Sequence, residues 1–414
     1  MLPERWLILA DDLTGAADTA IAFARAGWAA SVAWGGAAPE DAVLSLDADS
    51  RRLTGTEAAD RHAALLQAHA GGRGALFKKI DSTLRGQPAA ELAGALRALR
   101  GQGHRALAVV APAFPALGRT TVAGCIRLDG QPLEASPLWA REHSYPTADL
   151  CAVLAGEGLR TRHAPLGLVR DPHGALAGLL AEALADGTDA LVCDAALEAD
   201  LDRIASAGRP VAVELLWVGS AGLARALAGA VSAEFVAASR AAGGILTVVG
   251  SLAEASRAGV ALLADDPALL LLTVSPASLR YGPSSPDWRI QAAAAVAALA
   301  AGRDVLVAIQ ADPGATPAVG ALLAERLGLL LAPAAPLAGA LVVTGGETAR
   351  AVCDAFGIAG IRMLAEIEPG VPLGLAHATR ALPIITKAGG FGDAGTLSRC
   401  LAHLRRLPIL ESPV

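Results

Sequence analysis

Two adjacent acids, Asp11 and Asp12, follow the short apolar run Trp6–Ala10 near the start of the chain. The run predicts a buried strand, and open α/β sheets bind their ligands at the carboxyl ends of strands. Either carboxylate can accept hydrogen bonds from sugar hydroxyls, hold Mg²⁺ or act as a general base. The alternative is structural, because Asp12 or Thr14 can cap a helix that begins near Gly15. Capping does not require two acids in a row.

A second charged cluster follows another apolar run, in the sequence Lys-Lys-Ile-Asp-Ser-Thr-Leu-Arg-Gly. Here Lys79, Asp81 and Arg85 place two cations and one acid within a short stretch of chain. An arginine can hold a carboxylate through two parallel hydrogen bonds, and Asp81 can accept a hydrogen bond from a hydroxyl. Arg51, which follows a third predicted strand, can add a cation at the same edge. The alternatives are a solvated loop in which Asp81 or Ser82 caps a helix, and a surface turn at Arg51.

Two glycine-containing turns in the second half lead from an apolar run into a helical stretch. One contains Gly250 and Ser251, and the other reads Thr-Gly-Gly-Glu-Thr from Thr344 to Thr348. The free N–H groups and positive dipole end of a helix N-terminus suit phosphate, and glycine lets the backbone approach a ligand closely. Each turn alone could be an ordinary connection. Two of them in one half of the chain favour nucleotide binding.

A third glycine-rich segment, Thr386–Asp393, contains a formal GxGxxG match at Gly390, Gly392 and Gly395. A dinucleotide-binding fold requires a following strand with an acid about 20 residues further on. Only one short helix is expected after this segment, so the match is discounted. The chain contains no GxxxxGK[ST] sequence, which excludes a P-loop nucleotide-binding site.

Short apolar runs alternate with helical stretches along the chain, which is typical of an α/β fold with mostly parallel strands. In the first half, strands are expected at Trp6–Ala10, Ala30–Trp34, Val43–Asp47, Ala75–Lys79 and Ala106–Ala111, and helices at Glu57–His69 and Ala89–Leu99. In the second half, strands are expected at Ile245–Val249, Leu269–Val274, Val305–Ile309, Leu341–Thr344 and Leu382–Thr386. Helices are expected between them at Ser256–Leu263, Trp288–Ala301, Pro317–Leu327 and Glu347–Phe356.

The stretch Ser239–Gly244 interrupts this alternation just before a new strand, which predicts a domain boundary. Two domains are expected, at residues 1–238 and 244–408. Each is predicted to be a mostly parallel sheet flanked by helices, with the active site in the cleft between them. A length of 414 residues, with 53% hydrophobic and 18% charged residues, is sufficient for two buried cores.

Charge and cysteine usage narrow the class of partner. The net charge is −6 and there is no basic tract, which argues against a nucleic-acid partner. The five cysteines show no metal-binding or disulfide spacing, so a reducing cytoplasm is expected. The N-terminus lacks a signal-peptide pattern, and the longest uncharged run, Leu327–Gly346, is interrupted by Pro333 and Pro336. No membrane span is expected.

Taken together, the motifs resemble those of the four-carbon acid sugar kinase family. The matching pieces are ADDLTGA from Ala10, KKIDSTLRG from Lys78, the proline–GRTT loop around Arg119, the Gly250-Ser251 turn, TGGETA from Thr344 and KAGGFG from Lys387. They occur in family order over nearly the whole chain. Family members often have a second serine where this chain has Ala253, and KSGNFG where it has Ala388 and Gly390.

The resemblance implies an N-terminal domain that binds the acid sugar and a C-terminal domain that binds ATP with Mg²⁺. Family substrates are D-threonate, D-erythronate and 3-oxo-tetronates, phosphorylated at the C4 hydroxyl. The sugar site is expected at Asp11, Asp12, Arg51, Lys79, Asp81 and Arg85, with Asp12 or Asp81 as the base. The ATP site is expected at Ser251, Gly345, Gly346, Glu347, Thr348, Lys387, Gly389 and Gly390. Glu347 is expected to reach Mg²⁺ through water.

The sequence leaves two other classes of function open. One is a ribokinase-like sugar kinase that uses Asp393 as its base, although the chain after Asp393 is short for that fold. The other is a non-catalytic sensor that binds an acid sugar and a nucleotide. The expected partners are therefore small molecules, and a homodimer is left open.

Overall fold

The computed structural model describes residues 3–35, 39–71, 74–136, 139, 145–229, 238–311, 317–377 and 382–410. The chain divides into two compact units. The first comprises Met1–Ala30 and Glu40–Ser232, and the second comprises Ser31–Pro39 and Ala233–Val414. The segment Ser31–Pro39, which the sequence interpretation placed in the first domain, thus clusters with the second unit.

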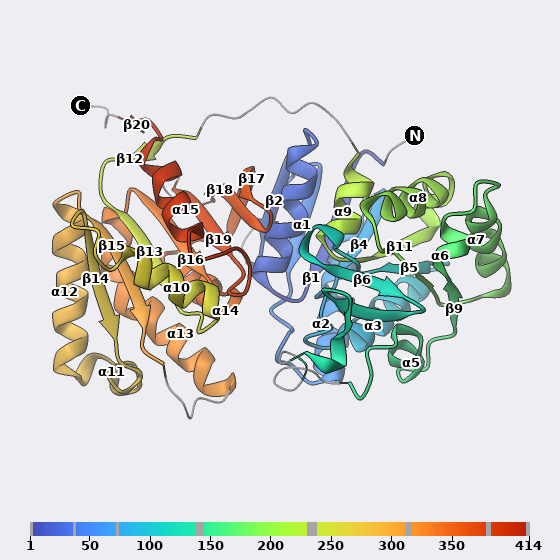
Figure 1. Ribbon diagram of the computed structural model, residues 1–414, viewed down its shortest axis with the longest axis horizontal. Helices are drawn as coiled ribbons and strands as arrows, with labels where there is room; N and C mark the ends of the chain where they lie inside the picture. The colour runs from blue at the N-terminus through green and yellow to red at the C-terminus, as the bar shows by residue number, and fades with distance from the viewer. Residues whose placement is uncertain are drawn as a thin grey trace. The chain divides into compact units, whose positions relative to one another are not determined.

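The first unit has a parallel sheet with strand order β3-β1-β4-β11-β5-β10-β9 (Figure 1). Its strands are β1 (Trp6–Ala10), β3 (Val43–Asp47), β4 (Ala75–Lys79), β5 (Leu107–Ala111), β9 (Thr161–Ala164), β10 (Ala190–Cys193) and β11 (Leu215–Gly219). Most of their residues are buried, as expected for a parallel sheet covered by helices on both faces. The strands predicted in this unit are confirmed to within one residue.

Helices cover both faces of this sheet (Figure 1). One face carries α1 (Leu13–Arg25), α8 (Glu198–Gly208) and α9 (Ala221–Ala228), with α6 (Leu166–Val169) and α7 (Ala175–Asp186) beside α8. The other carries α2 (Gly55–His69), α3 (Pro88–Gly101) and α5 (Leu150–Ala155). After β5 the chain forms a small antiparallel sheet of β6 (Arg119–Val122), β7 (Cys125–Leu128) and β8 (Gln131–Pro132), which the sequence did not predict.

The second unit has parallel strands in the order β14-β15-β13-β16-β19, followed by β18, β17 and β2 in antiparallel pairing. These strands are β2 (Ala30–Ala33), β13 (Ile245–Val249), β14 (Leu269–Val274), β15 (Asp304–Ile309), β16 (Ala340–Thr344), β17 (Gly360–Glu368), β18 (Val371–Ala376) and β19 (Pro383–Lys387). The predicted parallel strands are confirmed, whereas β17 and β18 were missed. A short pair, β12 (Arg240–Ala241) and β20 (Ile409–Leu410), completes the unit.

The helices of the second unit are α10 (Glu254–Leu263), α11 (Pro276–Tyr281), α12 (Pro286–Ala300), α13 (Pro317–Leu331), α14 (Gly346–Ala355) and α15 (Thr396–Arg405). Helix α10 packs against α15, and α13 packs against α14. Between the sheet and the α10–α15 layer lies an apolar core that includes Val249, Leu306 and Ile385 from the strands and Leu263 and Leu401 from the helices.

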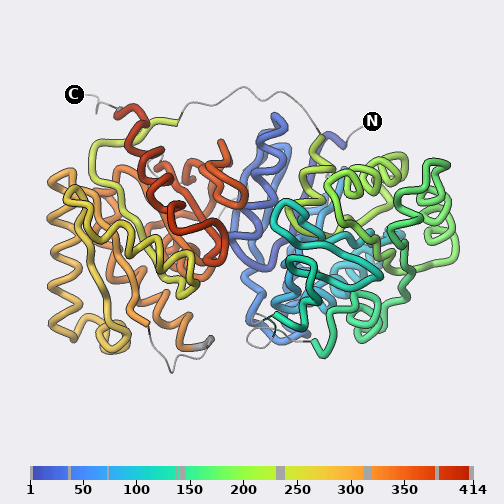
Figure 2. The backbone as a smooth tube through the Cα atoms, viewed as in Figure 1, coloured from blue at the N-terminus to red at the C-terminus, as the bar shows by residue number. Residues whose placement is uncertain are grey.

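The path of the chain explains why Ser31–Pro39 belongs to the second unit. In Figure 2 the blue chain leaves α1, contributes β2 and then returns to β3. Strand β2 pairs with β17 through Val32 opposite Ile361, and Trp34 donates from Nε1 to Asp354 at 2.8 Å. The chain therefore passes from one unit to the other before β2, after β2 and again between Ser232 and Ala233.

One stretch, Val319–Leu337, is long and apolar enough to cross a membrane by length and mean hydropathy alone. It consists of most of α13 and a 3₁₀ segment that contains Pro336. Leu327 and Leu331 are fully buried, whereas Leu329 is exposed. This one-sided burial against α14 is typical of a surface helix of a globular core.

Candidate functional site

Three neighbouring parallel strands, β3, β1 and β4, bring the predicted acid-sugar residues to one edge of the first sheet. Asp11 and Asp12 follow β1, Arg51 follows β3 by a few residues, and Lys79 ends β4. The backbone amides of Ser50 and Arg51 both donate to the carbonyl of Asp11, at 3.0 and 3.3 Å. The loop after β3 is therefore attached to the end of β1.

Arg51 is the centre of this cluster. Its Nε lies 2.7 Å from Asp11 Oδ2, its Nη1 lies 2.8 Å from Asp12 Oδ2, and its Nη2 lies 3.6 Å from Asp81 Oδ2. Arg85 Nη2 lies 2.7 Å from the same Asp81 oxygen. The structure thus brings all the predicted acids together around one guanidinium, which a surface turn at Arg51 does not explain.

Asp12 combines the two roles that the sequence left open. Its Oδ1 accepts from the amide of Gly15 at 2.8 Å, so Asp12 is the N-cap of α1. Its Oδ2 accepts from Thr14 Oγ1 and also faces Arg51. A Cβ at position 15 would lie 2.7 Å from Asp12 Oδ1 and 3.0 Å from Lys79 Nζ, so only glycine lets the helix approach both charged groups this closely.

Asp81 is held by more partners than Asp12. Its Oδ1 accepts from the amide of Thr83 at 2.9 Å and from the Thr83 hydroxyl, while its Oδ2 faces the two arginines. The loop turns back through Leu84, which is buried and has φ = 59°. A left-handed leucine is strained, and such strain persists where the surroundings enforce it, often at functional sites. Here the turn returns Arg85 to Asp81.

The charges around the acids determine their ionisation. Burial acts to raise the pKa of Asp12, but the charges of Arg51 and Lys79 hold it below its usual value. Burial likewise opposes ionisation of Asp81, and the charges of Arg85 and Arg51 hold its pKa well below the usual range. Both carboxylates are therefore ionised at neutral pH and can accept hydrogen bonds from substrate hydroxyls.

Two groups in the cluster retain unused hydrogen-bonding capacity. Asp11 is buried, and within the described residues its Oδ1 has no hydrogen-bond partner. Lys79 is 5% exposed, and its ammonium forms no hydrogen bond with the described part of the chain. A buried polar atom without a partner, such as Asp11 Oδ1, is uncommon in folded proteins, so the cluster indicates a place where a polar ligand binds.

Beneath the cluster lies a buried network that the sequence interpretation missed. Lys78 Nζ lies 2.7 Å from Glu91 Oε2, and Ser50 Oγ donates to Glu91 Oε1 at 2.6 Å. His62 Nε2 lies 3.0 Å from Ser50 Oγ, and burial together with the charge of Lys78 lowers the pKa of this histidine. Because Ser50 precedes Arg51 and Lys78 precedes Lys79, the network fixes both segments that carry cations into the cluster.

Arg119, in the proline–GRTT loop, also lies close enough to interact with the cluster. It begins β6, and its charge interacts with those of Asp81 and Arg85, although burial is the main effect that lowers its pKa. Its Nη1 donates to the carbonyl of Leu117 at 2.7 Å. The signal in the sequence was its position after β5, a strand of the same parallel sheet.

The predicted nucleotide residues of the second unit also gather at strand ends. Ser251, the turn from Gly345 and the turn after Lys387 follow β13, β16 and β19, which are adjacent and parallel. Gly345 has φ = 90°, a value that favours glycine, and its amide donates to the carbonyl of Lys387 at 2.8 Å. The structure therefore brings the three turns to one edge.

Glycine is sterically required where these turns meet. A Cβ on Gly250 would collide with the Thr348 side chain, and one on Gly389 would collide with Ser251 Oγ. At Gly390, by contrast, a Cβ would meet no atom within 4 Å, so the asparagine of the KSGNFG pattern is sterically compatible with this position. Ala253 provides no side-chain cap for α10. Instead, Ser251 Oγ accepts from the Ala253 amide at 3.2 Å.

Two of the predicted nucleotide residues differ in their surroundings. Glu347 is exposed in the first turn of α14. Lys387 is buried, and its ammonium is surrounded by the carbonyls of Ala388, Gly389 and Phe391. Among the described residues, no three His, Cys, Asp or Glu side chains form a metal-binding group. A metal at this edge would therefore take most of its ligands from phosphate and water.

Asp393, the base of the ribokinase-like alternative, has a local structural role. Its Oδ1 accepts from the amide of Gly395 and from Arg399 Nη2, both at 2.8 Å. These hydrogen bonds lower its pKa, and its side chain is largely exposed. The contacts are those of a residue that organises the start of α15.

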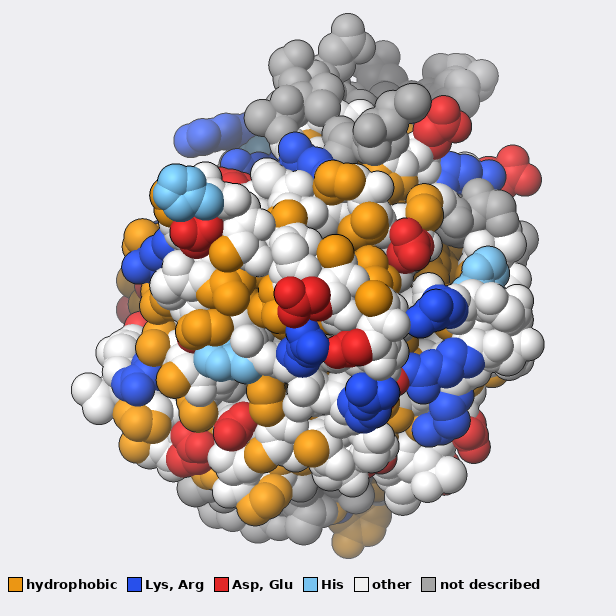
Figure 3. All heavy atoms as spheres, turned by 90° about the vertical axis from the view of Figure 1, so that its right-hand side faces the viewer, with side chains coloured by type: hydrophobic (Ala, Val, Ile, Leu, Met, Phe, Trp, Pro, Cys, Tyr) orange, Lys and Arg blue, Asp and Glu red, His pale blue; other side chains and the backbone are white. Residues whose placement is uncertain are grey.

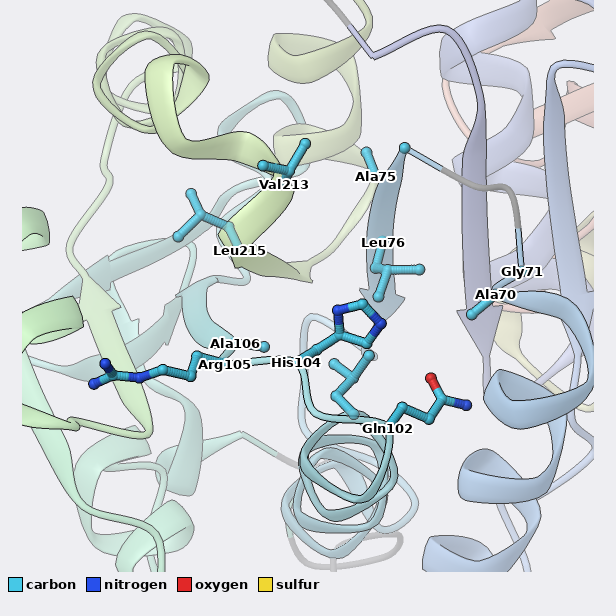
Figure 4. A pocket seen from close by; sticks show the side chains of 12 residues that line it. Ala70, Gly71, Ala75, Leu76, Gln102, His104, Arg105, Ala106, Val213 and Leu215 are labelled. Carbon is cyan, nitrogen blue, oxygen red and sulfur yellow. The ribbon is translucent and has the colours of Figure 1, made fainter.

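A cavity of about 220 Å³ lies at the opposite, amino-terminal edge of the first sheet. Figure 4 shows His104, Gln102 and Leu76 lining it, near the beginnings of β4, β5 and β11. Ligands of α/β sheets bind at the carboxyl ends, where the charged cluster lies. In Figure 3, where the right-hand side of Figure 1 faces the viewer, acidic, basic and apolar side chains are interspersed on the surface.

Comparisons with known proteins relate the two halves of the chain to two different domain families. Residues 6–227 match a family described as a sugar-binding N-terminal domain, and residues 246–397 match a nucleotide-binding C-terminal domain. The chain is 44% identical to D-threonate kinase of Cupriavidus necator, covering 95% of this chain and 96% of that protein. It is 34% identical to D-threonate kinase of Bordetella bronchiseptica, covering 96% and 97% of the two chains.

More distant relatives include D-erythronate kinase of Heliobacterium modesticaldum, at 28% identity over 96% of each chain. Among solved structures, a Salmonella typhimurium protein described as a putative tRNA synthase superposes with a TM-score of 0.81 at 22% identity. That superposition covers 96% of this chain and 99% of the other. At this identity the likeness establishes the fold alone.

Proposed function

This chain belongs to the four-carbon acid sugar kinase family, and we propose that its substrate within that family is D-threonate, phosphorylated at the C4 hydroxyl by ATP. The observation that carries the choice of acid is the relationship, over nearly the whole length of both chains, to a D-threonate kinase at 44% identity. The relatives that act on erythronate or 3-oxo-tetronate have identities of 28–30%.

The cluster of the first unit supports acid-sugar binding. Without Arg119, the cluster has three acids and three cations, whose charges balance. Among these cations, only Lys79 forms no hydrogen bond with the described residues. Lys79 is therefore the proposed partner of the substrate carboxylate, with Arg85 beside it. An uncharged sugar would leave this buried ammonium unpaired, which costs several kcal/mol in buried sites.

The acids are proposed to hold the hydroxyls. Asp11 Oδ1 has no partner among the described residues, so it is the proposed acceptor for one substrate hydroxyl. Asp12 is preferred over Asp81 as the base at the C4 hydroxyl because Asp81 Oδ1 accepts two hydrogen bonds, whereas Asp12 Oδ1 accepts only from the Gly15 amide among the described residues. Phosphoryl transfer proceeds through a loose transition state that needs positioning more than a strong base, which is compatible with an acid of lowered pKa.

The turns of the second unit support nucleotide binding. The amides at the start of α14, the Ser251 hydroxyl and the glycines of the turn after Lys387 are the proposed contacts for the phosphates of ATP. Mg²⁺, when bound with ATP, would neutralise charge on the phosphates. Glu347 is the proposed protein group nearest to it, acting through water, because Glu347 is exposed in the first turn of α14.

The cellular setting is proposed to be the cytoplasm. The cysteines of the described chain are all free, and three of them, Cys193, Cys353 and Cys400, are buried. Free buried thiols are compatible with a reducing compartment. The proposed partners are the acid sugar and ATP.

A coupled assay of ADP formation with D-threonate, D-erythronate, a 3-oxo-tetronate and D-ribose tests the proposal. The highest kcat/KM is expected for D-threonate, and phosphorus–proton correlation in the NMR spectrum of the product should place phosphate on C4. A higher kcat/KM for another four-carbon acid would correct the substrate. A higher value for ribose would refute the assignment to acid sugars.

A further inference from the structure

Lysine is rare in this chain, and each lysine is buried at the end of a strand. Of the 34 Lys and Arg residues only three are lysine, namely Lys78, Lys79 and Lys387. Their exposed fractions are 0, 5 and 1%. Arginine supplies the positive charge everywhere else, so the three lysines stand where a compact ammonium on a flexible stem is needed. Lys78 pairs with Glu91 and Lys79 belongs to the acid-sugar cluster, which leaves Lys387.

The ammonium of Lys387 lies inside a cage of oxygen atoms. Lys387 Nζ donates to the carbonyls of Phe391 at 2.7 Å, Ala388 at 3.1 Å and Gly389 at 3.1 Å, and lies 3.4 Å from Ser256 Oγ. An ammonium has three N–H donors, so these acceptors use all of its capacity. No carboxylate of the described residues forms an ion pair with it. The side chain therefore bends back under the turn 388–391 that follows it.

The groups packed around this ammonium do not provide an opposite charge in contact. Glu368 is the nearest acid by its electrostatic influence, and it is already paired with Arg399 at 2.6 Å. Cys400 on α15 is the other titratable neighbour, and burial raises the pKa of its thiol to about 12, so it is neutral. Burial lowers the pKa of Lys387 to about 8. The carbonyl dipoles are thus the main compensation for its charge.

The cage determines where the amides of the turn point. Because the C=O and N–H of a trans peptide point in opposite directions, carbonyls that converge on Lys387 Nζ leave the next amides directed away from it. These are the amides of Gly389, Gly390 and Gly392. Within the described chain, none of the three donates a hydrogen bond. Successive free amides of this kind form an anion-binding nest.

The same turn is fastened to the neighbouring phosphate-binding turns. Ser256 Oγ donates to the Gly389 carbonyl at 2.9 Å, and the Gly345 amide donates to the Lys387 carbonyl at 2.8 Å. Gly389 also packs so closely on Ser251 that no side chain fits there. The position of the turn therefore depends on an ammonium at its back and on contacts at its sides.

We propose that Lys387 is a positioning residue whose ammonium acts as a cation built into the fold, holding the carbonyls of the turn on one side so that the amides of Gly389, Gly390 and Gly392 face the phosphates of ATP. The proposal rests on the nucleotide site described above. It differs from a direct contact of Lys387 with the phosphates of ATP; the sequence interpretation placed Lys387 in the ATP site without assigning its contact. Direct contact would require the ammonium to leave its oxygen cage.

Three substitutions separate the two roles. Lys387→Arg keeps the charge and is a good phosphate ligand, but a planar guanidinium is too large for the cage. Lys387→Met keeps the volume and removes the donors. Lys387→Ala removes three carbons and the nitrogen, which together correspond to n-propylammonium. Ammonium and n-propylammonium are therefore the rescue probes, and tetramethylammonium, which has the charge but no donor, is the control.

Calorimetry with ATP in sodium chloride should show a loss of affinity of at least tenfold in all three variants, with D-threonate affinity within twofold of the wild type. At equal ionic strength, n-propylammonium chloride should restore ATP binding to Lys387→Ala by at least fivefold, and tetramethylammonium chloride should not. Retained ATP affinity in Lys387→Arg, or no rescue of a folded Lys387→Ala, would overturn the proposal.

A measurement without ATP keeps the test independent of the nucleotide site. Hydrogen exchange of the ligand-free protein should be at least tenfold faster at the Phe391 amide, which donates to the Ala388 carbonyl at 3.1 Å, in Lys387→Met than in the wild type, since the turn loses its cage. Direct phosphate contact predicts no change in the free protein. Wild-type protein that fails to bind ATP would instead refute the proposed function, whatever the exchange result.

If the variants fail to fold, wild-type protein labelled with ¹³C at lysine Cε answers the question. Only three lysine signals are expected. The Lys387 signal should not shift appreciably when ATP binds, because its ammonium stays in the cage, whereas a large shift with a change in titration would indicate direct phosphate contact.

Discussion

Replacing Arg51 by glutamine tests whether one guanidinium holds the acid cluster together. Arg51 makes contacts of 2.7 and 2.8 Å with Asp11 and Asp12 and a longer one of 3.6 Å with Asp81. A hydrogen bond to a charged group contributes about 1.5–3 kcal/mol, and breaking a buried ion pair costs about 3–5 kcal/mol. Because the Arg51 side chain is 21% exposed, water offsets part of the loss. We expect the free energy of unfolding to fall by about 3 kcal/mol.

The dependence on pH makes this prediction more specific. The pKa values of Asp12 and Asp81 are lowered in the folded protein, with Arg51 among the causes. A lowered carboxyl pKa gives stability that is present above the unfolded pKa, about 3.9, and is lost as the pH falls through the folded pKa. The difference between wild type and Arg51→Gln should therefore be constant from pH 5 to 8 and should narrow below about pH 4.

Urea unfolding followed by circular dichroism measures this difference, with hydrogen exchange at β1 and β4 to assign the transition to the first unit. Arg97→Gln is the matched control, because Arg97 is exposed on α3 and forms no ion pair with the described residues. It should change stability by less than about 0.5 kcal/mol. A loss of under 1 kcal/mol for Arg51→Gln, or a loss equal to that of Arg97→Gln, would refute the central role of Arg51.

The remaining predictions concern catalysis, the supporting network and the buried lysine. Asp12→Asn should fold and still cap α1, yet its kcat should fall by at least about 10²-fold. The kcat of Asp81→Asn should fall by as much. Near-normal kcat in both variants would leave these acids only a capping role. Glu91→Gln leaves Lys78 without its ion pair, so the free energy of unfolding should fall by about 3 kcal/mol or more. A variant of unchanged stability with an unchanged KM for D-threonate would contradict the supporting role of the network. The pKa of Lys387 is about 8 in the folded protein against 10.5 for a free lysine. The unfolded state therefore binds more protons between pH 8 and 10.5. The free energy of unfolding should rise with pH in that window, by up to about 3 kcal/mol. Buried thiols with raised pKa values oppose this trend. The rise is therefore measured as the difference in the free energy of urea unfolding between wild type and Lys387→Met. A difference that does not change with pH would show that Lys387 does not titrate between pH 8 and 10.5.

The regular elements could be predicted because their patterns are local. Buried parallel strands such as β1 and β13 read as short apolar runs, and α2 begins at Thr54 with a capping box to Glu57. The antiparallel pair β17 and β18 was missed because polar and apolar residues do not alternate strictly in Gly360–Glu368. Its signal was the Pro369-Gly370 turn between the two strands, where Gly370 has φ = 78°.

Long-range arrangement was harder to predict. Strand β2 lies early in the sequence, yet it pairs with β17 more than 300 residues later, which no local pattern indicates. The motifs identified the charged residues at strand ends, but their partners could not be read from the sequence. Arg51 proved to be the centre of the cluster, and Glu91 and His62 support it from helices whose spacing resembles an ordinary buried face.

Lys387 illustrates the same limit at a single residue. Its place beside a glycine-rich turn indicates phosphate binding, and a lysine there is readily interpreted as a phosphate ligand. The direction of its side chain depends on carbonyls of the following residues and on Ser256 from helix α10. Only the folded structure shows that the ammonium faces the back of the turn.

Separate acid-sugar and nucleotide sites are tested most directly by measuring the affinity for both ligands in two variants, one from each unit. Lys79→Met removes the proposed partner of the substrate carboxylate, and Gly346→Val crowds the amides at the start of α14. Titration calorimetry with D-threonate and with a non-hydrolysable ATP analogue should show a loss of at least tenfold in D-threonate affinity for Lys79→Met, with analogue affinity within twofold of wild type. Gly346→Val should show the reverse. Equal losses of both ligands in either variant, in protein that remains folded, would contradict separate acid-sugar and nucleotide sites.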